Sequence, residues 1–421
     1  MTDVIIIGAG IAGTSAAHSL SRKGVKVLVL EARDRTGGRI HTLTGSGFST
    51  HAEAGAEFIH GSAPLTHKLA RQAGIATFKS EANAWEVYKA HLKPSEVISP
   101  DIEQLNRKLQ KLKQDMPMGD FLREYFPGPE NAELRENTKY LIQGFDAADV
   151  EKISAFSLRD EWSEEDEFTG HRPLGGYQQF VDYLVMQSTK AGAEYRLSST
   201  VKQIRWSPDE VEVTIVSGQV YRGRKVIVTI PAAILKLESI QFEPGIPLHF
   251  DALQKLETGG VSKFLFEFKN AFWEKELPGV RQISNLGFLF SDAYVPTWWT
   301  QRPSPAPLLT GWLAGPITRE LPTENTLISE AVKSLSYIFD CREEKILENL
   351  QTSRVINWMS DPLARGAYAY ATVNTRGAVE VLSKPVAKTI YFAGEAFNNG
   401  DAMGTVEAAL ASADHVVRSI L

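Results

Sequence analysis

Three glycines and one acidic residue near the N-terminus have the spacing of a dinucleotide-binding turn. Gly8, Gly10 and Gly13 follow a run of β-branched residues, and a second apolar run ends directly before Glu31. In such a unit the first glycine permits a tight turn, the second lets a pyrophosphate approach the backbone, and the third lets helix and strand pack closely. The phosphates then lie at a helix N-terminus. Glu31 is placed to accept hydrogen bonds from the adenosine ribose, and an acid there disfavours a 2′-phosphorylated cofactor.

The elements that must position this turn are a strand over 3–7, a helix from 11 to about 23 and a strand over 25–30. The consecutive apolar residues of the first run are typical of a strand buried on both faces of a parallel sheet. Apolar residues alternate over 211–215 and a Ser-Gly turn follows at 217–218, which predicts antiparallel strands. The sequence therefore predicts a mixed α/β fold with a Rossmann-like dinucleotide-binding domain.

Composition excludes several classes of protein. The 421 residues are 43% hydrophobic and 23% charged, which is ordinary for a soluble enzyme of two or three domains. The net charge of −6 argues against nucleic acid as a partner. Cys341 is the single cysteine, so no internal disulfide or multi-cysteine metal site can form, and we expect no metal. No apolar run reaches 18 residues and the N-terminus lacks a basic leader, so we expect no membrane partner and a cytoplasmic location.

A second glycine-rich motif follows Glu31 and points to a particular family. Residues 31–39 read E-A-R-D-R-T-G-G-R, and residues 55–61 read G-A-E-F-I-H-G. A nicotinamide enzyme has no need of a Gly-Gly-Arg phosphate contact directly after the ribose-binding acid. The two motifs resemble the flavin-containing amine oxidase family, of the monoamine oxidase and polyamine oxidase type. The pocket motifs are most similar to those of polyamine oxidases. The resemblance implies the amine oxidase type of FAD-binding domain and FAD as cofactor.

The resemblance also implies which residues contact FAD. The glycines and Arg39 would surround the pyrophosphate and ribityl chain, and residues 55–58 would run along the isoalloxazine. Val201 would lie against the adenine through its backbone. Thr405 and its neighbour begin the last helix, whose amides would stabilise negative charge on the ring. The implied cofactor-binding residues are Gly8, Gly10, Ala12, Gly13, Glu31, Ala32, Arg33, Gly38, Arg39, Gly55, Ala56, Glu57, Phe58, Val201, Trp358, Gly394, Glu395, Gly404, Thr405 and Val406.

Four residues are implied as catalytic by the same resemblance. Lys263 matches the family lysine that holds a water near flavin N5 and is linked to the reaction with oxygen, although a lysine with its head in solvent is the alternative. Trp358 and Tyr368 match aromatic walls in front of the flavin, although aromatic residues are often core. His60 matches a histidine that lines the substrate tunnel, although a lone histidine is often structural. Ala367 stands where monoamine oxidases carry the flavin-linked cysteine, so FAD is expected to be non-covalent.

The chain is expected to divide into an FAD-binding domain and a discontinuous substrate-binding domain. Residues 1–80, 166–235 and 376–421 form the first in this prediction, and residues 81–165 and 236–375 form the second. The discontinuity follows from the resemblance more than from composition. The first insertion shows little strand signal. The strand that carries Lys263 is predicted by alternation.

These residues predict an FAD-dependent oxidase of a primary or secondary amine, with a polyamine as the expected substrate, O2 as second substrate and hydrogen peroxide as product. An L-amino-acid oxidase of the same fold is an alternative, but Phe58 occupies the position of its carboxylate-binding arginine. A dehydrogenase that passes electrons to another acceptor, or a flavin-binding scaffold, also remains open. Histone demethylation would need a long helical insertion, for which 421 residues leave no room. The acidic run 161–167 is either a solvated face or a surface that attracts polycations. The oligomeric state is not predicted.

Overall fold

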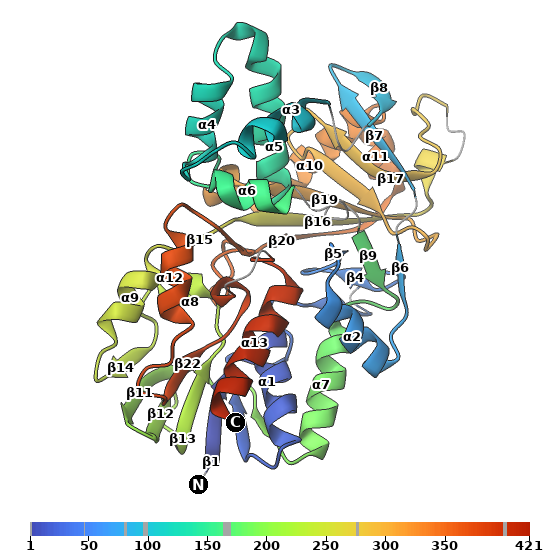
Figure 1. The fold of residues 1–421 in the computed structure, drawn as a ribbon. Coiled ribbons are helices and arrows are strands. Elements are labelled where there is room, and N and C mark those ends of the chain that lie inside the picture. The colour runs from blue at the N-terminus through green and yellow to red at the C-terminus, as the bar shows by residue number, and fades with distance from the viewer. Residues whose placement is uncertain are drawn as a thin grey trace.

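The fold has two large sheets, one in the lower and one in the upper half of Figure 1. It comes from a computed structural model that describes residues 2–45, 47–79, 82–95, 100–162, 170–274, 278–398 and 402–421. Both chain ends lie in the lower half, so the last helix returns to the first strand. The mixed α/β class predicted from the sequence is confirmed.

The lower sheet contains the predicted parallel core. Residues Ile5 and Ile6 of its first strand are fully buried, as expected for a strand covered on both faces. The parallel neighbours pair with this strand directly or through one strand, and an antiparallel meander extends the sheet. The strands, in their order across the sheet, are β10 (Glu194–Arg196), β2 (Val27–Leu30), β1 (Thr2–Ile7), β13 (Val220–Val228), β12 (Glu210–Ile215), β11 (Val201–Ser207) and β14 (Gln241–Glu243), with β22 (Ile390–Phe392) paired to β13.

Helices cover both faces of the lower sheet and create two apolar cores. The helices around the first core meet the Gly-rich turn and the end of the chain (Figure 1). Those of the first core are α1 (Ile11–Ser21), α2 (Pro64–Ala73), α7 (Gln178–Lys190) and α13 (Val406–Ile420), and those of the second are α8 (Ala232–Leu235), α9 (Pro247–Leu253) and α12 (Thr375–Leu382).

The upper sheet is mainly antiparallel and carries Lys263 on the strand next to one edge. That strand is β16 (Val261–Phe268), and all eight of its residues are buried. The strand was predicted, but the alternation on which the prediction rested does not reflect an exposed face, because helices and the lower half cover both sides. The strands in order are β20 (Leu350–Asn357), β16, β19 (Leu308–Ala314), β18 (Thr297–Thr300), β17 (Leu286–Ser291), β7 (Asn83–Tyr88) and β8 (His91–Pro94).

Two groups of helices pack around the upper sheet. One group folds from the first insertion and closes the left side of the upper half in Figure 1. Its members are α3 (Pro100–Leu109), α4 (Met118–Tyr125), α5 (Ala132–Phe145) and α6 (Ala155–Glu161), while the other group is α10 (Glu324–Ile338) and α11 (Glu343–Asn349).

The first insertion contains a β-hairpin, so the expectation of little strand there is wrong. Strands β7 and β8 form the edge of the upper sheet. Their turn places Lys89 at φ 49° and Ala90 at φ 65°. Such two-residue turns usually carry Asn or Gly, which tolerate positive φ. Lys-Ala therefore hid the hairpin in the sequence.

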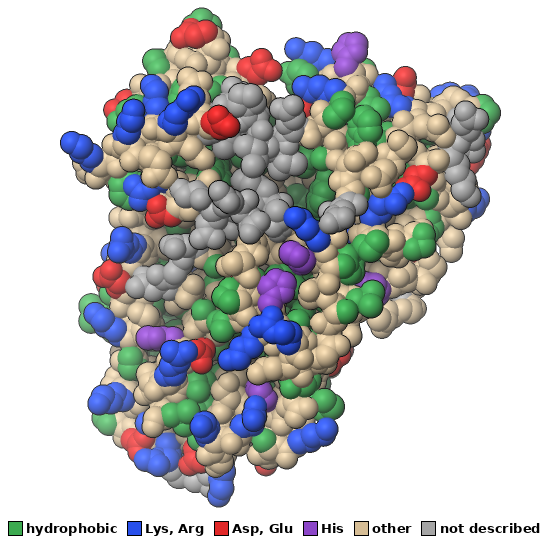
Figure 2. Space-filling view, turned by 45° about the vertical axis from the view of Figure 1, so that its right-hand side comes forward, with side chains coloured by type: hydrophobic (Ala, Val, Ile, Leu, Met, Phe, Trp, Pro, Cys, Tyr) green, Lys and Arg blue, Asp and Glu red, His purple; other side chains and the backbone are tan. Residues whose placement is uncertain are grey.

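A small sheet lies between the two halves and carries further site residues. Its strands are β5 (Ile59–His60), β9 (Gly170–Pro173) and β6 (Thr77–Lys79). The predicted domain boundaries stay a prediction, and β14 beyond residue 235 belongs to the lower sheet. Within the ranges described, no helix is long and apolar enough to cross a bilayer. Lys and Arg side chains are spread over the whole face shown in Figure 2, with Asp and Glu between them.

Candidate functional site

A single cavity joins the predicted site residues from all parts of the chain. It has a volume of about 1840 Å³ and runs from the Gly-rich turn of the lower half to helix α5 and the β7–β8 hairpin. Every predicted cofactor-binding or catalytic residue lines it except Gly13. The predicted residues therefore converge on this cavity from distant parts of the chain.

The N-terminal turn leaves open space where a ligand phosphate would lie. A Cβ on Gly10 would meet nothing closer than the Gly37 carbonyl oxygen, at 3.9 Å. A Cβ on Gly13 would stand 2.0 Å from the carbonyl oxygen of Gly8, so Gly13 serves helix–strand packing and not the cavity. Helix α1 begins at Ile11 with no side-chain cap and no acidic residue in its first turn. Its N-terminal amides are thus available to an anion.

Glu31 is held rigidly at the end of β2. Its carboxylate accepts hydrogen bonds from the Ala9 N–H at 2.6 Å and from the Arg33 N–H at 2.8 Å. The Arg33 guanidinium binds both oxygens of Asp361, at 2.7 and 3.1 Å. The second glycine motif is thereby fastened to the loop that follows Trp358.

The Gly-Gly-Arg segment depends on an arginine that the sequence reasoning did not single out. Arg35 donates to the carbonyl oxygens of Gly38 (2.9 Å), Thr36 and Ile40, and so holds the loop closed around its own side chain. Arg39 donates to Glu395 Oε1 and to the Ala367 carbonyl oxygen, both at 2.7 Å. This links the first segment of the chain to the last.

These observations fit an FAD. The open space at Gly10, the uncapped helix end and the buried acid at the end of the second strand are the features that a pyrophosphate and a ribose require. Glycine is also required further along, because a Cβ on Gly55 would lie 1.7 Å from the Arg39 carbonyl oxygen. Among the described residues no group of His, Cys, Asp and Glu has the arrangement of a metal site.

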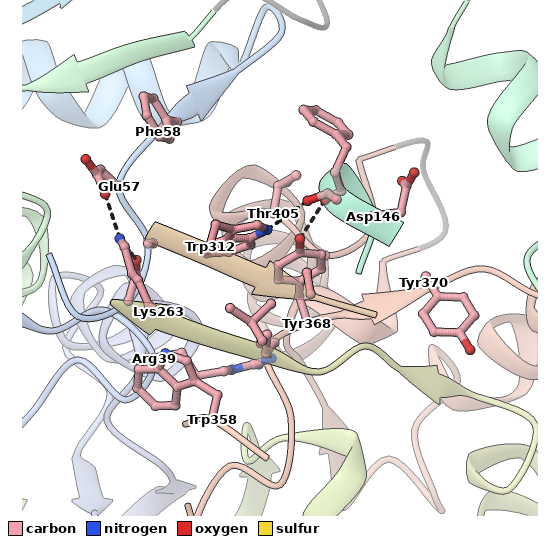
Figure 3. Close-up of a pocket in the computed structure, with 18 of the residues that line it drawn as sticks. Arg39, Glu57, Phe58, Asp146, Lys263, Trp312, Trp358, Tyr368, Tyr370 and Thr405 are labelled. Atoms are coloured by element: carbon pink, nitrogen blue, oxygen red, sulfur yellow. Dashed lines mark hydrogen bonds and ion pairs between the residues drawn. The ribbon is translucent and has the colours of Figure 1, made fainter. Parts of the chain in front are cut away.

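Lys263 is a buried cation with a fixed counter-ion. Its Nζ donates to Glu57 Oε2 at 2.6 Å and to the Gly55 carbonyl oxygen at 3.1 Å (Figure 3). The other oxygen of Glu57 accepts from Trp299 Nε1 at 2.8 Å and forms an ion pair with Arg172 at 3.1 Å. Burial raises the pKa of Glu57, but Lys263 and Arg172 outweigh it and hold the pKa below its ordinary value. The alternative of a lysine whose head reaches solvent is wrong, because Lys263 is 1% exposed.

The predicted aromatic residues occupy two separate places. Tyr368 donates its hydroxyl to the Phe145 carbonyl oxygen (2.6 Å), and Trp312 donates to the Gly144 carbonyl oxygen (2.8 Å). Both rings pack in one cluster against the end of α5, whereas Trp358 lies beside Arg39 and donates to the Ala54 carbonyl oxygen (Figure 3). The ring that accompanies Tyr368 is thus Trp312, which the sequence reasoning missed.

Two carboxylates lie near Tyr368. Asp146 and Glu161 line the cavity. Burial is the larger cause that raises the pKa of the Tyr368 hydroxyl, and the charges of these two carboxylates raise it further. Glu161 begins the acidic run considered above, but its members 163–167 lie outside the described residues. Acidic groups among aromatic walls create a place for a cationic ligand.

His60 lies in the cavity as a neutral imidazole. Burial lowers its pKa from 6.5 to about 4. Its ring packs edge-on against Phe145, with centroids 5.2 Å apart, and beside Phe58 at 5.7 Å. Its Nδ1 has no hydrogen-bond partner in the part of the chain that the structure describes. It therefore adds a polar atom to the cavity without a charge at neutral pH.

The N-terminus of α13 opens on the cavity, as the resemblance implies. Thr405 caps the helix by accepting from the Ala408 N–H at 3.1 Å. Glu407 in the first turn also lines the cavity, and its carboxylate accepts from the backbone N–H groups of Leu65 and Thr66 at the start of α2. The two helix ends are thereby locked together.

Glu53 is a buried acid behind Glu57 that was not predicted. It accepts from the Tyr177 N–H at 2.7 Å and from the Thr42 hydroxyl. Burial, as the largest cause, raises its pKa to about 7. It stands beside the glycine loop, in β4 (Ala52–Glu53). An acidic residue two positions before the Gly-Ala motif was the available signal.

Comparisons with curated proteins extend along nearly the whole chain. The family model described as flavin containing amine oxidoreductase matches residues 11–421. A lysine-specific histone demethylase 1 homolog 2 from Oryza sativa subsp. japonica is 28% identical over 94% of this chain and 54% of its own length. Polyamine oxidase 3 from the same plant is 27% identical over 93% of this chain and 84% of its own length. The chain spans about half the length of the demethylase relatives that it matches.

Solved structures share the complete fold. Putrescine oxidase with bound putrescine has a TM-score of 0.83 at 19% identity, over 100% of this chain and 98% of that one. Cyclohexylamine oxidase from Brevibacterium oxydans IH-35A has a TM-score of 0.80 at 19% identity, over 100% and 99%. Such identities show the fold alone. Because the family model covers nearly the whole sequence and the nucleotide cradle fits its cofactor, this chain belongs to the flavin-containing amine oxidoreductase family, and FAD is its cofactor.

Proposed function

We propose that the protein oxidises a primary or secondary amine, of the polyamine class, with O2 as electron acceptor and with FAD held non-covalently. The observation that carries the proposal is the shared cavity. A nucleotide cradle lines one part of it, and aromatic rings with two carboxylates line another. The chemistry that FAD supplies when bound is that of a hydride acceptor, for a hydride equivalent from the α-carbon of the amine. The balanced reaction converts amine, O2 and water into an aldehyde, a shorter amine or ammonia, and hydrogen peroxide.

The chain's own residues would bind and orient the amine. Tyr368 and Trp312 offer flat apolar faces to its alkyl chain, and both are held by the backbone of α5. Asp146 and Glu161 attract a second cationic group of the same substrate. His60 stays neutral and so does not repel it. A non-covalent cofactor is supported by Ala367 beside Tyr368 and by the distance in sequence to Cys341.

An amino-acid oxidase would need a cation free to bind the substrate carboxylate. Arg172 does lie over the Phe58 ring, 4.4 Å from its centroid. Its Nη1 is nevertheless bound to the carbonyl oxygens of Thr300 and Arg302, its Nη2 is ion-paired with Glu57, and Arg172 is not among the residues that line the cavity. This arrangement favours an amine over an amino acid.

Peroxide release tests the proposal across a panel of amines. The panel contains spermine, spermidine, putrescine, acetylated polyamines, monoamines, amino acids and an N-methyllysine peptide, which the demethylase relatives suggest. We expect peroxide with di- or polyamines above all others. Bleaching of the yellow band that recovers only with an added acceptor would instead support a dehydrogenase. A preparation to which FAD does not bind would overturn the proposal.

A further inference from the structure

Lys263 and Arg172 place two positive charges in the protein interior. Lys263 is 1% exposed and Arg172 is 5% exposed. Most Lys and Arg side chains are exposed, as the face in Figure 2 illustrates, and among the described residues only these two cationic side chains are buried. Isolated buried cations are costly, because the interior replaces little of the hydration they lose. The pair therefore needs a nearby anion.

Glu57 supplies that anion and is held from three directions. Lys263 of β16, Trp299 of β18 and Arg172 of β9 each bind its carboxylate. These elements belong to two different sheets, so the carboxylate cannot move without breaking contacts to both. Its position is therefore more restricted than that of a surface glutamate.

Arg172 is itself fixed by groups that do not titrate. Its Nη1 donates to the carbonyl oxygens of Thr300 (3.0 Å) and Arg302 (3.1 Å), and its guanidinium covers the ring of Phe58. Arg172 thus anchors Glu57, and Glu57 in turn anchors Lys263. The contacts therefore lead from the backbone of Thr300 and Arg302, through Arg172 and Glu57, to Lys263.

The Lys263 ammonium is bound by two residues of the short segment 55–57. Gly55 and Glu57 accept two of the three N–H groups of its ammonium. The third has no acceptor among the residues that the structure describes. The Nζ of Lys263 also lies over the Trp299 ring, 5.5 Å from the centroid, at the lining of the cavity.

We propose that Glu57 is the positioning residue of Lys263, and that Arg172 holds Glu57 in place, so that the three side chains act as one unit. The kinetic part of this inference rests on the proposed function, in which Lys263 serves the reaction with oxygen. Glu53 is the further titratable group that faces the unit, from β4. The unit binds and orients, and no proton transfer is assigned to it.

A double-variant cycle on the holoenzyme tests the proposal. The variants are Glu57→Gln, Lys263→Met and the two combined, each measured for melting temperature. Glu57→Gln should lower the melting temperature by about 5 °C or more, because it leaves two cations unpaired. The double variant should melt above Glu57→Gln, since one of those cations is gone. Additive losses would overturn the proposal, as would failure of both Glu57→Gln and the double variant to fold.

The second readout is the rate at which O2 restores the flavin band after reduction by amine. Glu57→Gln should slow this recovery about as much as Lys263→Met, and the double variant should be no slower than Lys263→Met. Glu57→Asp should regain stability, because it keeps the charge, but should recover slowly, because its carboxylate is withdrawn. A slow Lys263→Met with a wild-type Glu57→Gln would overturn the positioning role. A wild-type rate in Lys263→Met would instead overturn the proposed role of Lys263, with the melting cycle still deciding for Glu57.

Glu267 provides the matched control on the same strand. It is a glutamate of β16, 1% exposed, and its carboxylate accepts from the Ser49 N–H at 2.9 Å. Glu267→Gln should lower stability without slowing oxygen recovery, and its effect should add to that of Lys263→Met. The main cycle is repeated in a Glu53→Gln background, so that Glu53 cannot ionise to replace the lost charge. If the effects of Glu57→Gln and Lys263→Met become additive in this background, the coupling depends on Glu53 and the positioning role of Glu57 is overturned.

Discussion

The turn around Gly10 faces the same cavity as the wall formed by Lys263, Glu57 and Trp299, yet the two regions are assembled differently. The turn is made of backbone from within the first 31 residues, where glycines leave room and Glu31 binds the Ala9 N–H. The wall is made of side chains from strands β16 and β18 and from the loop between β4 and β5, with Lys263 bound to Glu57 across 206 positions. A backbone device is specified by local geometry, whereas a side-chain network exists only once distant elements have packed. Substitutions in the turn should therefore act through steric contact. Substitutions in the wall should act by leaving a buried charge without its partner.

Gly13→Ala should have the largest effect of all. The new Cβ would stand 2.0 Å from the Gly8 carbonyl oxygen, which belongs to the turn and cannot withdraw. We expect a loss of more than about 3 kcal/mol of stability, visible as little folded protein. Gly377→Ala in α12 is the matched control, because nothing lies within 4 Å of its Cβ. It should be neutral or stabilising by up to about 1 kcal/mol. A well-folded, yellow Gly13→Ala would contradict the packing role.

Gly10→Val should separate ligand binding from folding within the same turn. Gly10 has φ −72°, which valine adopts, and its Cβ would point into open space. The apoprotein should melt near the wild-type temperature, with a capping loss of about 1 kcal/mol. FAD affinity should fall about 100-fold or more, because the side chain fills the phosphate space. Titration of both apoproteins with FAD measures this, and equal affinities would show that the phosphates lie elsewhere.

The carboxyl group of Glu53, which lies behind Glu57, should make the stability of the fold depend on pH. Its pKa is raised from 4.5 to about 7 in the folded state, so the folded chain retains a proton that the unfolded chain loses. Stability should therefore fall as pH rises from about 4.5 to 7, by about 3 kcal/mol, and this contribution should be level above 7. Denaturant unfolding at pH 5 and pH 8 gives the difference. In Glu53→Gln the difference should shrink by that amount, and an unchanged difference would show that other groups cause it.

His60→Ala should have the smallest effect, confined to substrate length. The imidazole lines the cavity and carries no charge near neutral pH. Loss of one polar contact, about 1 kcal/mol, should lower kcat/KM for spermine about fivefold and leave a short monoamine unchanged. Comparison of the two substrates provides the internal control. Equal kinetics for spermine would remove His60 from the substrate path.

Sequence reasoning reached the cavity residues by motif but missed their partners. Gly55, Lys263 and Tyr368 belong to recognisable patterns, and all three line the cavity. Arg172, although it lies in a motif that resembles the family, and Trp312 were assigned no role, because their importance comes from what they touch. Resemblance can identify a position, but it does not report the contacts made by a residue type that differs there.

The same limit applies to the fold. The parallel core of the lower sheet was predictable, since β1 and β2 are apolar runs beside the glycine turn. The β7–β8 hairpin was not, since its turn uses Lys89 and Ala90 at positive φ. Neighbours in the upper sheet impose that conformation, and no local preference announces it.

The sequence by itself determined the nucleotide cradle, the family and hence FAD, because glycine spacing acts through local backbone geometry. Only the tertiary structure decided that Lys263 is buried against Glu57, and that Trp312 accompanies Tyr368 at the end of α5. The physical reason is that an ion pair or an aromatic wall needs atoms within a few ångströms. Residues hundreds of positions apart reach that distance only when sheets and helices have packed.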